Sequence, residues 1–535
     1  MRHVRNLIIG AGPAGLQLAY SLRQVGQDHL ILERNEFAGS YFVPYPRHGR
    51  LISINKVYTG YPDLESRRRY DWNSLVCDDE ELQFTGFTKE YFPAKEVLVE
   101  YLGAFAKHYQ LKIEYGTAVT RVSKGGDGFV ITTAADETMS CDRLFIATGL
   151  PYTNDPEIPG VELCEKYDRF SVNPEDYTDQ RIFIAGKGNS AFETADALVP
   201  TTRKIWVCGK RAVRLAWASH YVGDLRAVNN NYLDTYQLKA QNNILDGELR
   251  SVSRDEATGD LVASVWFESR QQELQYPCDR VLLCTGWRAD LGIFDEDCAP
   301  DRNINGRFPR MTCEWESTNV PNMYFAGTIM QSRDYRKTMS AFIHGFRHNV
   351  VALANLLGMK DSEDGSWPEE QAMPSSAAEL SEHTIERLST SAPMLLQPGF
   401  LGDVIVPDAD GDGFSYRADM PVDYVKERML SEEGTLYLIT LEYGKHDPDA
   451  NPFTMPRGVG VTEDFYIHPI VRRYDNGELT DRFWLPDDLD NDWRNEPMHR
   501  AGLAQWFESH LGGSAKDDSP DQAMSVSPAA SAQIG

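Results

Sequence analysis

The sequence predicts an α/β fold in which two strand–turn–helix units are nested and a small α+β module follows them. Strand-like apolar runs alternate with helical patterns through about residue 355, as in proteins whose parallel strands are joined by helices. Two glycine-rich turns, at 10–15 and 186–191, each stand between a strand-like run and a helical pattern. At 535 residues the chain has room for two or three domains.

The first unit begins with a short buried strand at 6–9 and a helix at 13–24, which has Pro13 at its start and Gly26 just beyond its end. Its further elements are expected at 29–32 (strand), 95–109 (amphipathic helix), 111–114 and 129–132 (antiparallel strands around a turn at 125–128) and 144–147 (strand). The second unit repeats the plan, with elements expected at 181–185 (strand), 190–198 (helix) and 204–208 (strand). Strands at 281–286 and 323–327 and a helix at 337–357 complete the pattern.

The glycine turn at 10–15 has the spacing of a dinucleotide-binding turn. Gly10 permits a tight turn, Gly12 lets the backbone approach a phosphate, and Gly15 allows close packing of helix on strand. The first N–H groups of the helix would then face the pyrophosphate. Glu33 ends the next strand, where an acceptor for a ribose hydroxyl is needed. We therefore interpret the first unit as a Rossmann-like FAD site.

The turn at 186–191 is a variant of the same pattern, with alanine in place of the third glycine. The strand after it ends in a group of cations instead of an acid: Lys210, Arg211 and Arg214. Cations pair with a 2′-phosphate, which an acid would repel, so the pattern favours NADPH over NADH. The alternative is that these three side chains only form a solvated face.

Composition narrows the range of partners and ligands. A net charge of −27 and a pI near 4.9 disfavour nucleic acid and anionic membranes, and no segment approaches the ~18 apolar residues of a membrane-spanning helix. The eight cysteines form no C-x-x-C pair and no zinc-site spacing, so we expect reduced thiols. Residues 408–419 have the spacing of a calcium loop, but the strand-like run at 402–406 favours a polar hairpin turn. We expect no metal.

Several blocks of the sequence together resemble a known family. They are GAGPAGLQLAYSL, YPRHGRLISINKVYTG, DWNSL, GKGNSAFETA, SHYVGDLRAVNNNYLDTYQLK, DYRKTMSAFIHGFRH, LEYGKHDPDANPFT and DFYIHP. The chain resembles, over nearly its whole length, the FAD-dependent oxidoreductase family of the endoplasmic-reticulum degradation flavoprotein, an outlying branch of the flavin-containing monooxygenases. Reticulum members carry signal and retention sequences that this chain lacks, so we expect a bacterial member that works in the cytoplasm.

The resemblance implies FAD in the first unit and NADPH in the second. The implied FAD positions are Gly10, Gly12, Gly15, Glu33 and Arg34 (adenosine and pyrophosphate), Val119 (adenine), Ser40, Tyr41, Asn55 and Lys56 (ribityl and flavin region), Thr148 and Gly149 (end of the third strand), and Gly327 and Thr328 (flavin end). The NADPH positions are Gly186, Gly188, Asn189, Ser190, Lys210, Arg211 and Arg214. Related reductases usually have Asp after the glycine at 327, so Thr328 favours the monooxygenases.

One motif of the monooxygenases is missing. Their fingerprint F-x-G-x-x-x-H precedes the second glycine turn, whereas here that stretch is Cys164-Glu-Lys-Tyr-Asp-Arg-Phe170, with every anchor replaced. In the larger family the fingerprint couples movement of the NADPH domain to the flavin. Its absence puts efficient oxygenation in question but leaves flavin reduction in place.

The leading hypothesis is an NADPH- and FAD-dependent monooxygenase that uses molecular oxygen to hydroxylate an amine or oxidise sulfur in a small-molecule substrate. Three residues are candidates for catalysis: Asn55 as a hydrogen-bond donor to the flavin, and His220 and His344 as pocket residues. Each has a structural alternative, such as a buried Asn that satisfies turn backbone. Two rival functions are an NADPH-dependent flavin oxidoreductase without oxygen insertion and a flavin-stabilised interaction protein whose residues 396–511 bind a protein client.

The domain organisation that follows has five parts. They are a discontinuous FAD-binding domain (1–176 and 281–358), an NADPH-binding domain (177–280), a linker rich in Ser, Glu, Pro and Ala (359–395), a C-terminal α+β module (396–511) and a disordered tail (512–535). No nucleic-acid or membrane partner is expected, and self-association as a homo-oligomer is left open.

Overall fold

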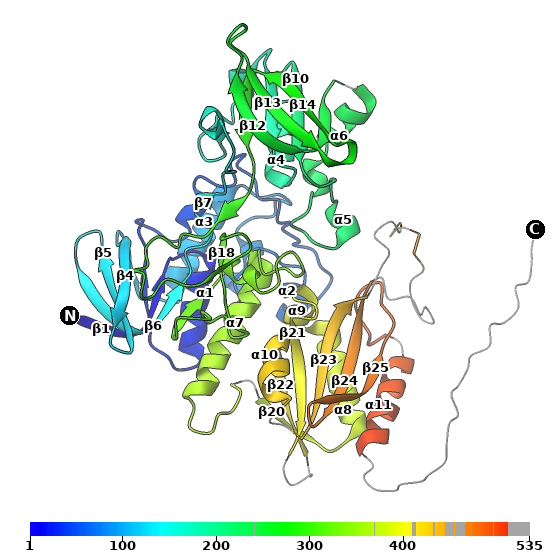
Figure 1. Ribbon diagram of the computed structural model, residues 1–535. Coiled ribbons are helices and arrows are strands. Elements are labelled where there is room, and N and C mark those ends of the chain that lie inside the picture. The colour runs from blue at the N-terminus through cyan, green and yellow to red at the C-terminus, as the bar shows by residue number, and fades with distance from the viewer. Residues whose placement is uncertain are drawn as a thin grey trace, which may run out of the picture.

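The computed structural model describes residues 1–239, 241–368, 370–408, 413–431, 434–444, 451, 454–455, 466–495 and 497–511. Figure 1 shows three groups of elements, each built around its own sheet or pair of sheets. Within the described ranges, no helix has the length and apolar character needed to cross a membrane. The expected tail at 512–535 lies outside these ranges. The structure confirms the mixed α/β class.

A seven-stranded sheet forms the core of the first group. Its order is β3(Ile113–Glu114), β2(Leu30–Leu32), β1(Arg2–Ile9), β6(Thr138–Ile146), β5(Gly128–Thr133) and β4(Val119–Gly125), and β19(Met323–Phe325) also pairs with β6. β1 runs parallel to β2 and to β6, and its second half is fully enclosed because helices cover the sheet. Of these helices, α1(Pro13–Gln24) contacts α3(Lys95–His108), α7(Ile343–Asp361), β1 and β2.

Two expectations for this group are corrected by the structure. The run at 111–114 contributes only the two-residue strand β3, which pairs parallel with β2 at the sheet edge. The strand opposite β5 across the turn at 125–128 is instead β4. The helix expected from 337 begins only at Ile343, because Phe342 has an extended backbone (φ −128°, ψ 157°) that a helix cannot include.

The second group, at the top of Figure 1, contains two sheets. The five-stranded sheet is parallel, in the order β11(Asn243–Asp246), β10(Lys204–Gly209), β9(Arg181–Ala185), β15(Arg280–Leu283) and β8(Glu165–Lys166). The helix α4(Asn189–Leu198) packs against β9 and β10. The antiparallel sheet consists of β12(Glu248–Arg254), β13(Leu261–Phe267) and β14(Gln272–Cys278), and it shares an apolar core with β9, β10 and β15.

Several short elements lie outside these sheets. They are α2(Leu64–Arg68), α5(Ala216–Ser219) and α6(Tyr232–Asp234), the pair β7(Tyr152–Thr153) with β16(Trp287–Arg288), and the pair β17(Arg302–Asn303) with β18(Phe308–Pro309). Because β7 pairs with β16, the two segments on which the chain passes between the first and second groups lie side by side.

The third group is a six-stranded antiparallel sheet with helices. The strand order is β20(Glu370–Pro374), β22(Gly413–Pro421), β21(Leu401–Pro407), β23(Thr435–Tyr443), β24(Ile467–Asp475) and β25(Glu478–Trp484). The accompanying helices are α8(Ala377–Thr390), α9(Ala392–Leu396), α10(Val422–Tyr424) and α11(Pro497–Leu511). α8 and α11 pack against each other, and both contribute to one apolar core with the sheet.

The expectation of a linker at 359–395 is wrong. This stretch contains the end of α7, the edge strand β20, all of α8 and most of α9. In α8, Leu380, Ile385 and Leu388 are fully buried, and Ser376 caps the helix by accepting the N–H of Glu379 at 3.4 Å. Glu379, Glu382 and Glu386 occupy the exposed positions of this amphipathic helix, whereas Ser381 and Ser389 are buried with the apolar side chains.

The segment with calcium-loop spacing lies in a hairpin. β21 and β22 pair antiparallel, and the N–H of Asp408 donates to the carbonyl of Gly413 at 3.0 Å, while residues 409–412 lie outside the described part. Asp419, the twelfth position of the spacing, forms an ion pair with Arg387 at 2.7 Å. Across the described residues, no group of three His, Cys, Asp or Glu side chains is arranged to hold a metal.

Buried arginines fasten the third group to the first. Arg69, just after α2, donates to the carbonyls of Ser389 and Asn491. Arg347 of α7 donates to the carbonyls of Ser74 at 2.6 Å and Arg68 at 2.8 Å. Because both guanidinium groups are almost completely enclosed, these bonds hold the segment between α2 and residue 77 against both groups at once.

Candidate active site

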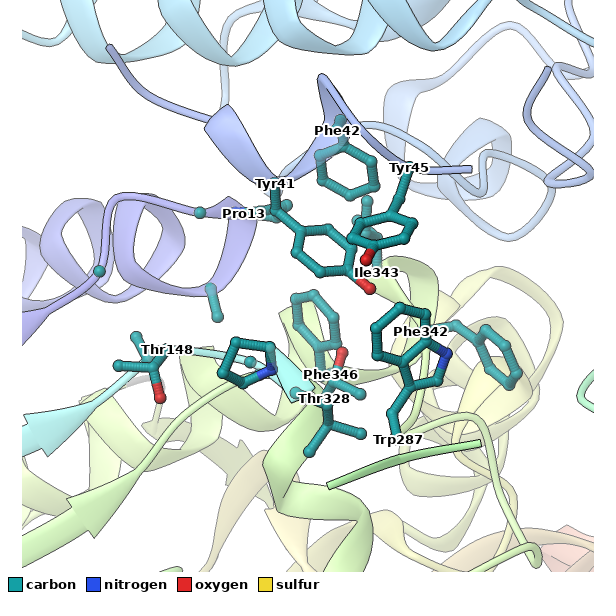
Figure 2. Close-up of a pocket in the computed structure, with 18 of the residues that line it drawn as sticks. Pro13, Tyr41, Phe42, Tyr45, Thr148, Trp287, Thr328, Phe342, Ile343 and Phe346 are labelled. Atoms are coloured by element: carbon teal, nitrogen blue, oxygen red, sulfur yellow. The ribbon is translucent and has the colours of Figure 1, made fainter. Parts of the chain in front are cut away.

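A cavity of about 550 Å3 lies between the first and second groups. Its wall is formed by the carboxyl ends of β1, β2 and β6, the N-termini of α1 and α4, the loop at 40–53, and the start of α7. Figure 2 shows Tyr41, Phe42 and Tyr45 on one side of this space and Trp287, Phe342 and Phe346 on the other. Strand ends and helix starts thus converge at one place, as in other open α/β sheets.

Each of the three positions in the first turn requires glycine for a different physical reason. A Cβ on Gly10 (φ 107°) would lie 2.7 Å from the Ala147 carbonyl oxygen, and one on Gly15 would lie 1.9 Å from the Gly10 carbonyl oxygen. A Cβ on Gly12 would meet no protein atom within 4 Å. Packing therefore requires Gly10 and Gly15, whereas Gly12 keeps free a part of the cavity next to the backbone. That is the space a pyrophosphate would need.

The N-terminus of α1 is suited to an anion. Gly12 is its N-cap and provides no side-chain cap, and Pro13 follows at the first helical position. The first N–H groups of the helix are consequently available to a ligand, and the helix dipole favours negative charge there.

Glu33 stands at the end of β2 with only 6% of its surface exposed. Its Oε2 accepts the N–H of Ala11 at 2.8 Å, and its Oε1 accepts both the backbone and the side-chain N–H of Asn35 at 3.0 Å. The Ser40 hydroxyl donates to the same Oε1 at 3.3 Å. These bonds hold the carboxylate in one orientation at the cavity wall, where a ribose hydroxyl could donate to it.

Fourteen of the residues predicted for the site do line the cavity. They are Gly10, Gly12, Glu33, Arg34, Ser40, Tyr41, Val119, Thr148, Gly149, Asn189, Ser190, Gly327, Thr328 and His344. Gly327 (φ 89°) lies so close to α1 that an added Cβ would come within 2.5 Å of the Ala14 Cβ. The loop carrying Thr328 is therefore pressed against the N-terminus of α1, on the same side as the first glycine turn.

The second glycine turn is built like the first. A Cβ on Gly186 (φ 132°) would lie 2.1 Å from the Cys284 carbonyl oxygen, whereas one on Gly188 would meet nothing within 4 Å. Gly188 is the N-cap of α4 and provides no side-chain cap. Gly15, Gly186 and Gly188 do not line the main cavity themselves; the first two shape the backbone of the turns, and the last leaves space beside the start of α4.

The three cations after β10 lie away from the main cavity. Lys210 is 71% exposed and stands 3.4 Å from Glu248, and Arg214 stands 3.3 Å from Asp224. Arg211 is exposed as well. Sequence reasoning overlooked Lys187, inside the second turn, whose side chain is almost fully enclosed and bonds to Asp246 and to the Arg211 carbonyl at 3.1 Å. Lys187 thereby ties the second turn to the strand end that carries the cations.

Two of the three candidates for catalysis are not brought to the cavity. Asn55 is buried, and its side-chain amide donates to the carbonyls of Thr88 at 2.8 Å and Glu90 at 3.3 Å. It satisfies turn backbone and has no place in the cavity wall, which corrects its assignment as a donor to the flavin. His220, the C-cap of α5, is absent from the cavity wall, and its ring stacks on Tyr443 of β23 in the third group with centroids 4.7 Å apart.

The third candidate, His344, lies in the wall at the start of α7. Its ring stacks on Trp72 with centroids 4.9 Å apart and on Phe342 at 5.7 Å. Burial, reinforced by the positive charges of Arg347, Arg226 and Lys56, holds the pKa of His344 well below its usual value. The imidazole is therefore neutral at physiological pH.

Sequence reasoning missed an aromatic group at the same end of the cavity. Tyr45 lies 4.9 Å from Tyr41 and 4.8 Å from Trp287, and Tyr167 lies 5.6 Å from Trp287, all between ring centroids. Tyr167 belongs to the stretch 164–170 that replaces the monooxygenase fingerprint. Arg47 holds this stretch by donating to the carbonyls of Tyr167 at 2.6 Å and Phe170 at 2.5 Å. The replaced motif thus contributes a cavity wall.

Glu193 of α4 is a second residue that the motif search passed over, although it stands inside the block GKGNSAFETA. It lines the cavity, and burial raises the pKa of its carboxyl to about 7. A carboxyl with this pKa exchanges its proton near neutral pH, which is the property a general acid or base requires.

Comparisons with known proteins agree with this geometry. The family profile described as pyridine nucleotide-disulphide oxidoreductase matches residues 7–327. The chain is 34% identical over 505 residues to FAD-dependent oxidoreductase domain-containing protein 2 of Mus musculus, covering 87% of this chain and 75% of that protein. The expected resemblance to an FAD-dependent oxidoreductase family is therefore confirmed.

Two solved structures share the fold of the first two groups. The bacillithiol disulfide reductase of Staphylococcus aureus superposes with a TM-score of 0.51 at 22% identity, covering 68% of this chain and all of that one. A flavin-containing monooxygenase from Stenotrophomonas maltophilia superposes with a TM-score of 0.51 at 18% identity, again covering 68% of this chain and all of that one.

FAD and NADPH are the cofactors of this protein, and the structure fits them. An uncapped helix N-terminus, the space beside Gly12 and the carboxylate of Glu33 form a cradle for the FAD, and the second turn repeats the first two of these features. Two glycine turns at one cavity, together with the match over residues 7–327, establish that this chain belongs to the pyridine nucleotide-disulphide oxidoreductase family and is a flavoprotein oxidoreductase.

Proposed function

We propose that this flavoprotein is an NADPH-dependent monooxygenase that reduces its FAD and oxygenates the nitrogen or sulfur of a small molecule. One observation supports this most: a single cavity takes wall residues from both glycine turns, Gly12 from the first and Ser190 from the second. A flavin and a nicotinamide bound at these turns would meet in the same space. FAD, when bound, supplies the ring that accepts a hydride and reacts with oxygen.

The residues of the chain have separable roles in this proposal. Glu33 orients the ribose, and the uncapped starts of α1 and α4 bind the two pyrophosphates. The aromatic group around Tyr45 and Trp287 shields the reacting region from water, which protects a reactive oxygen species from premature decay. Glu193, which holds its proton up to about neutral pH, is positioned to donate or accept one at the cavity wall.

An oxidoreductase without oxygen insertion is the second candidate, and a specific observation favours it. The amide of Asn55 is committed to backbone carbonyls, so the donor expected to stabilise the oxygenating species is not available from that residue. Reduction of a disulfide through a protein dithiol has less support. Among the described residues that form the cavity wall there is no cysteine, and such a relay needs two that stand close together.

Rapid mixing separates these possibilities. The FAD-loaded protein is first mixed with NADPH without oxygen, and bleaching of the flavin absorbance is followed. Oxygen labelled with 18O is then added with a panel of primary amines and thioethers, and label in the product is compared with hydrogen peroxide released. Labelled product supports the monooxygenase. Peroxide equal to the NADPH consumed with every compound supports the oxidase, and a flavin that NADPH does not bleach supports the interaction protein.

Two further expectations stay predictions: a cytoplasmic location, and the use of molecular oxygen with a small-molecule substrate as partners. Self-association as a homo-oligomer stays open.

A further inference from the structure

One end of the cavity gathers positive charge around a single indole ring. The Lys56 Nζ lies 5.0 Å from the ring centroid of Trp72, and the Arg226 guanidinium carbon lies 4.9 Å from it. The neutral ring of His344 stacks on the same indole at 4.9 Å. Trp72, Arg226 and His344 all belong to the cavity wall, with Lys56 next to them.

Neither cation has an acidic partner among the residues that the structure describes. The side chain of Arg226 donates only to the Ile52 carbonyl, at 3.4 Å, and Lys56 has only its contacts with the Tyr70 and Trp72 rings. By contrast Arg50, another cation of the cavity wall, forms an ion pair with Glu90 at 2.9 Å. Within the described part of the chain, the two cations beside Trp72 thus differ from Arg50 in having no carboxylate at ion-pair distance.

This arrangement costs free energy in the absence of a ligand. Both side chains are half-buried, and burial lowers the pKa of each, with the charge of Arg226 lowering the pKa of Lys56 further. The contact with the indole ring compensates for only part of the lost hydration. An anion bound in contact with these groups would restore the balance through charge-assisted hydrogen bonds.

The loop that carries Arg226 is fixed in place. Asn189 donates to the carbonyls of Gly223 at 3.3 Å and Asp224 at 2.9 Å, and it accepts the N–H of Arg226 at 2.8 Å. The guanidinium is therefore presented to the cavity by the start of α4 and not by a free chain segment. A prearranged cation of this kind is typical of ligand recognition.

We propose that Lys56 and Arg226 bind a carboxylate of the substrate, and that Trp72 and Phe342 contact its apolar body. The substrate is accordingly a small carboxylic acid with an apolar or aromatic portion. This inference rests on the proposed function in one respect: the bound acid is taken to be the molecule that the enzyme oxidises. The same chemistry, an anionic oxygen group, is also carried by the phosphates of NADPH, so the experiment must separate these two sources.

The test uses the FAD-loaded protein and two probes of equal shape, benzoate and its neutral amide benzamide. Binding is measured from the change in flavin absorbance, without oxygen or turnover. The wild-type protein is expected to bind benzoate at least about tenfold more tightly than benzamide, and Arg226→Gln and Lys56→Gln are each expected to weaken benzoate binding about tenfold, the effect of losing one charge-assisted hydrogen bond. The matched control is Arg254→Gln, which removes the same charge from an exposed position of β12.

A parallel titration with NADP+ identifies the source of the anion. Unchanged NADP+ binding in Arg226→Gln and Lys56→Gln, together with weakened benzoate binding, supports the proposal. Weakened NADP+ binding with unchanged benzoate binding overturns it, because the cations would then serve the nucleotide. Equal binding of benzoate and benzamide by the wild type overturns it without any variant, so a variant that fails to fold does not decide the matter. A failure to oxygenate leaves this result intact, because binding is measured without turnover.

Discussion

The side chain of Asn189, the first residue of α4, accepts the backbone N–H of Arg226 at 2.8 Å. This bond joins the second glycine turn to the loop at 223–229. The side-chain amide of Asn229, at the end of that loop, donates to the same Asn189 oxygen at 3.3 Å. A residue at the nucleotide-binding turn thus positions a cation at the far end of the cavity.

We expect Asn189→Ala to loosen this loop without unfolding the protein. The change removes the two hydrogen bonds that this half-buried amide donates and the two that it accepts, which should lower the free energy of unfolding by about 1–3 kcal/mol. NADPH and benzoate should both bind more weakly, because the turn and Arg226 are released together. Denaturant unfolding and the two binding titrations measure these effects. Asn189→Asp retains the acceptor for Arg226, so its benzoate binding should exceed that of Asn189→Ala; equal losses would contradict the role of this bond.

Gly12 and Gly15 allow a matched comparison. A methyl group at Gly12 meets no protein atom and φ there is an ordinary −77°, so Gly12→Ala should leave the stability of the FAD-free protein unchanged. It should weaken FAD binding at least about tenfold, because the methyl group occupies the space next to the pyrophosphate. Gly15→Ala places a methyl group 1.9 Å from the Gly10 carbonyl oxygen and should cost about 1–3 kcal/mol of stability with or without FAD. Thermal unfolding and bound FAD per chain distinguish the two, and a loss of FAD-free stability in Gly12→Ala would refute the assignment.

Glu193 should make both stability and activity depend on pH near neutrality. Burial raises the pKa of its carboxyl from 4.5 to about 7, so between these values the folded protein holds a proton that the unfolded chain has released. Stability contributed by this group is therefore present below 4.5 and falls as pH rises to about 7. Glu193→Gln, which stays neutral, should lose this component of the pH dependence while retaining the fold. The measurements are denaturant unfolding between pH 4.5 and about 7 and the pH profile of flavin reduction. Identical profiles for wild type and variant would show that Glu193 contributes neither to the pH dependence of stability nor to that of activity.

The cations after β10 should determine the preference for NADPH. Replacing Lys210 and Arg211 together with Ala should raise the KM for NADPH by about tenfold while changing the KM for NADH little, because only NADPH carries the 2′-phosphate that they would bind. Steady-state reduction of the flavin by each nucleotide provides the comparison. Equal changes for both nucleotides would assign these exposed side chains to the solvated surface.

Much of the cofactor-binding part could be predicted because it depends on local backbone geometry. Gly10 and Gly186 are recognisable since φ values of 107° and 132° are suited to glycine, and the turns they form stand directly between strand and helix. Glu33 could be assigned because its distance along the chain from the turn places it at the end of the neighbouring parallel strand. Such features involve few residues, close together in sequence.

At 359–395 the composition alone predicted a linker, where the structure has helices and an edge strand. Glu residues are frequent both in linkers and on the exposed face of a helix, and the serines inside α8 are buried. Only the burial of Leu380, Ile385 and Leu388 against the sheet of the third group distinguishes a helix from a linker here. Asn55 was misassigned for a similar reason. Its partners are the carbonyls of Thr88 and Glu90, more than thirty residues away, and no local pattern reveals that they claim its amide.

The sequence by itself determined the α/β class, the two glycine turns and the two cofactors, because each depends on backbone conformations that short motifs encode. Only the tertiary structure decided what surrounds the reacting groups. It placed Tyr167 from the replaced fingerprint beside Trp287, raised the pKa of Glu193 by burial, and set Lys56 and Arg226 around Trp72 with no acid beside them among the described residues. These properties arise from desolvation and from contacts between distant segments, which exist only when the chain is folded.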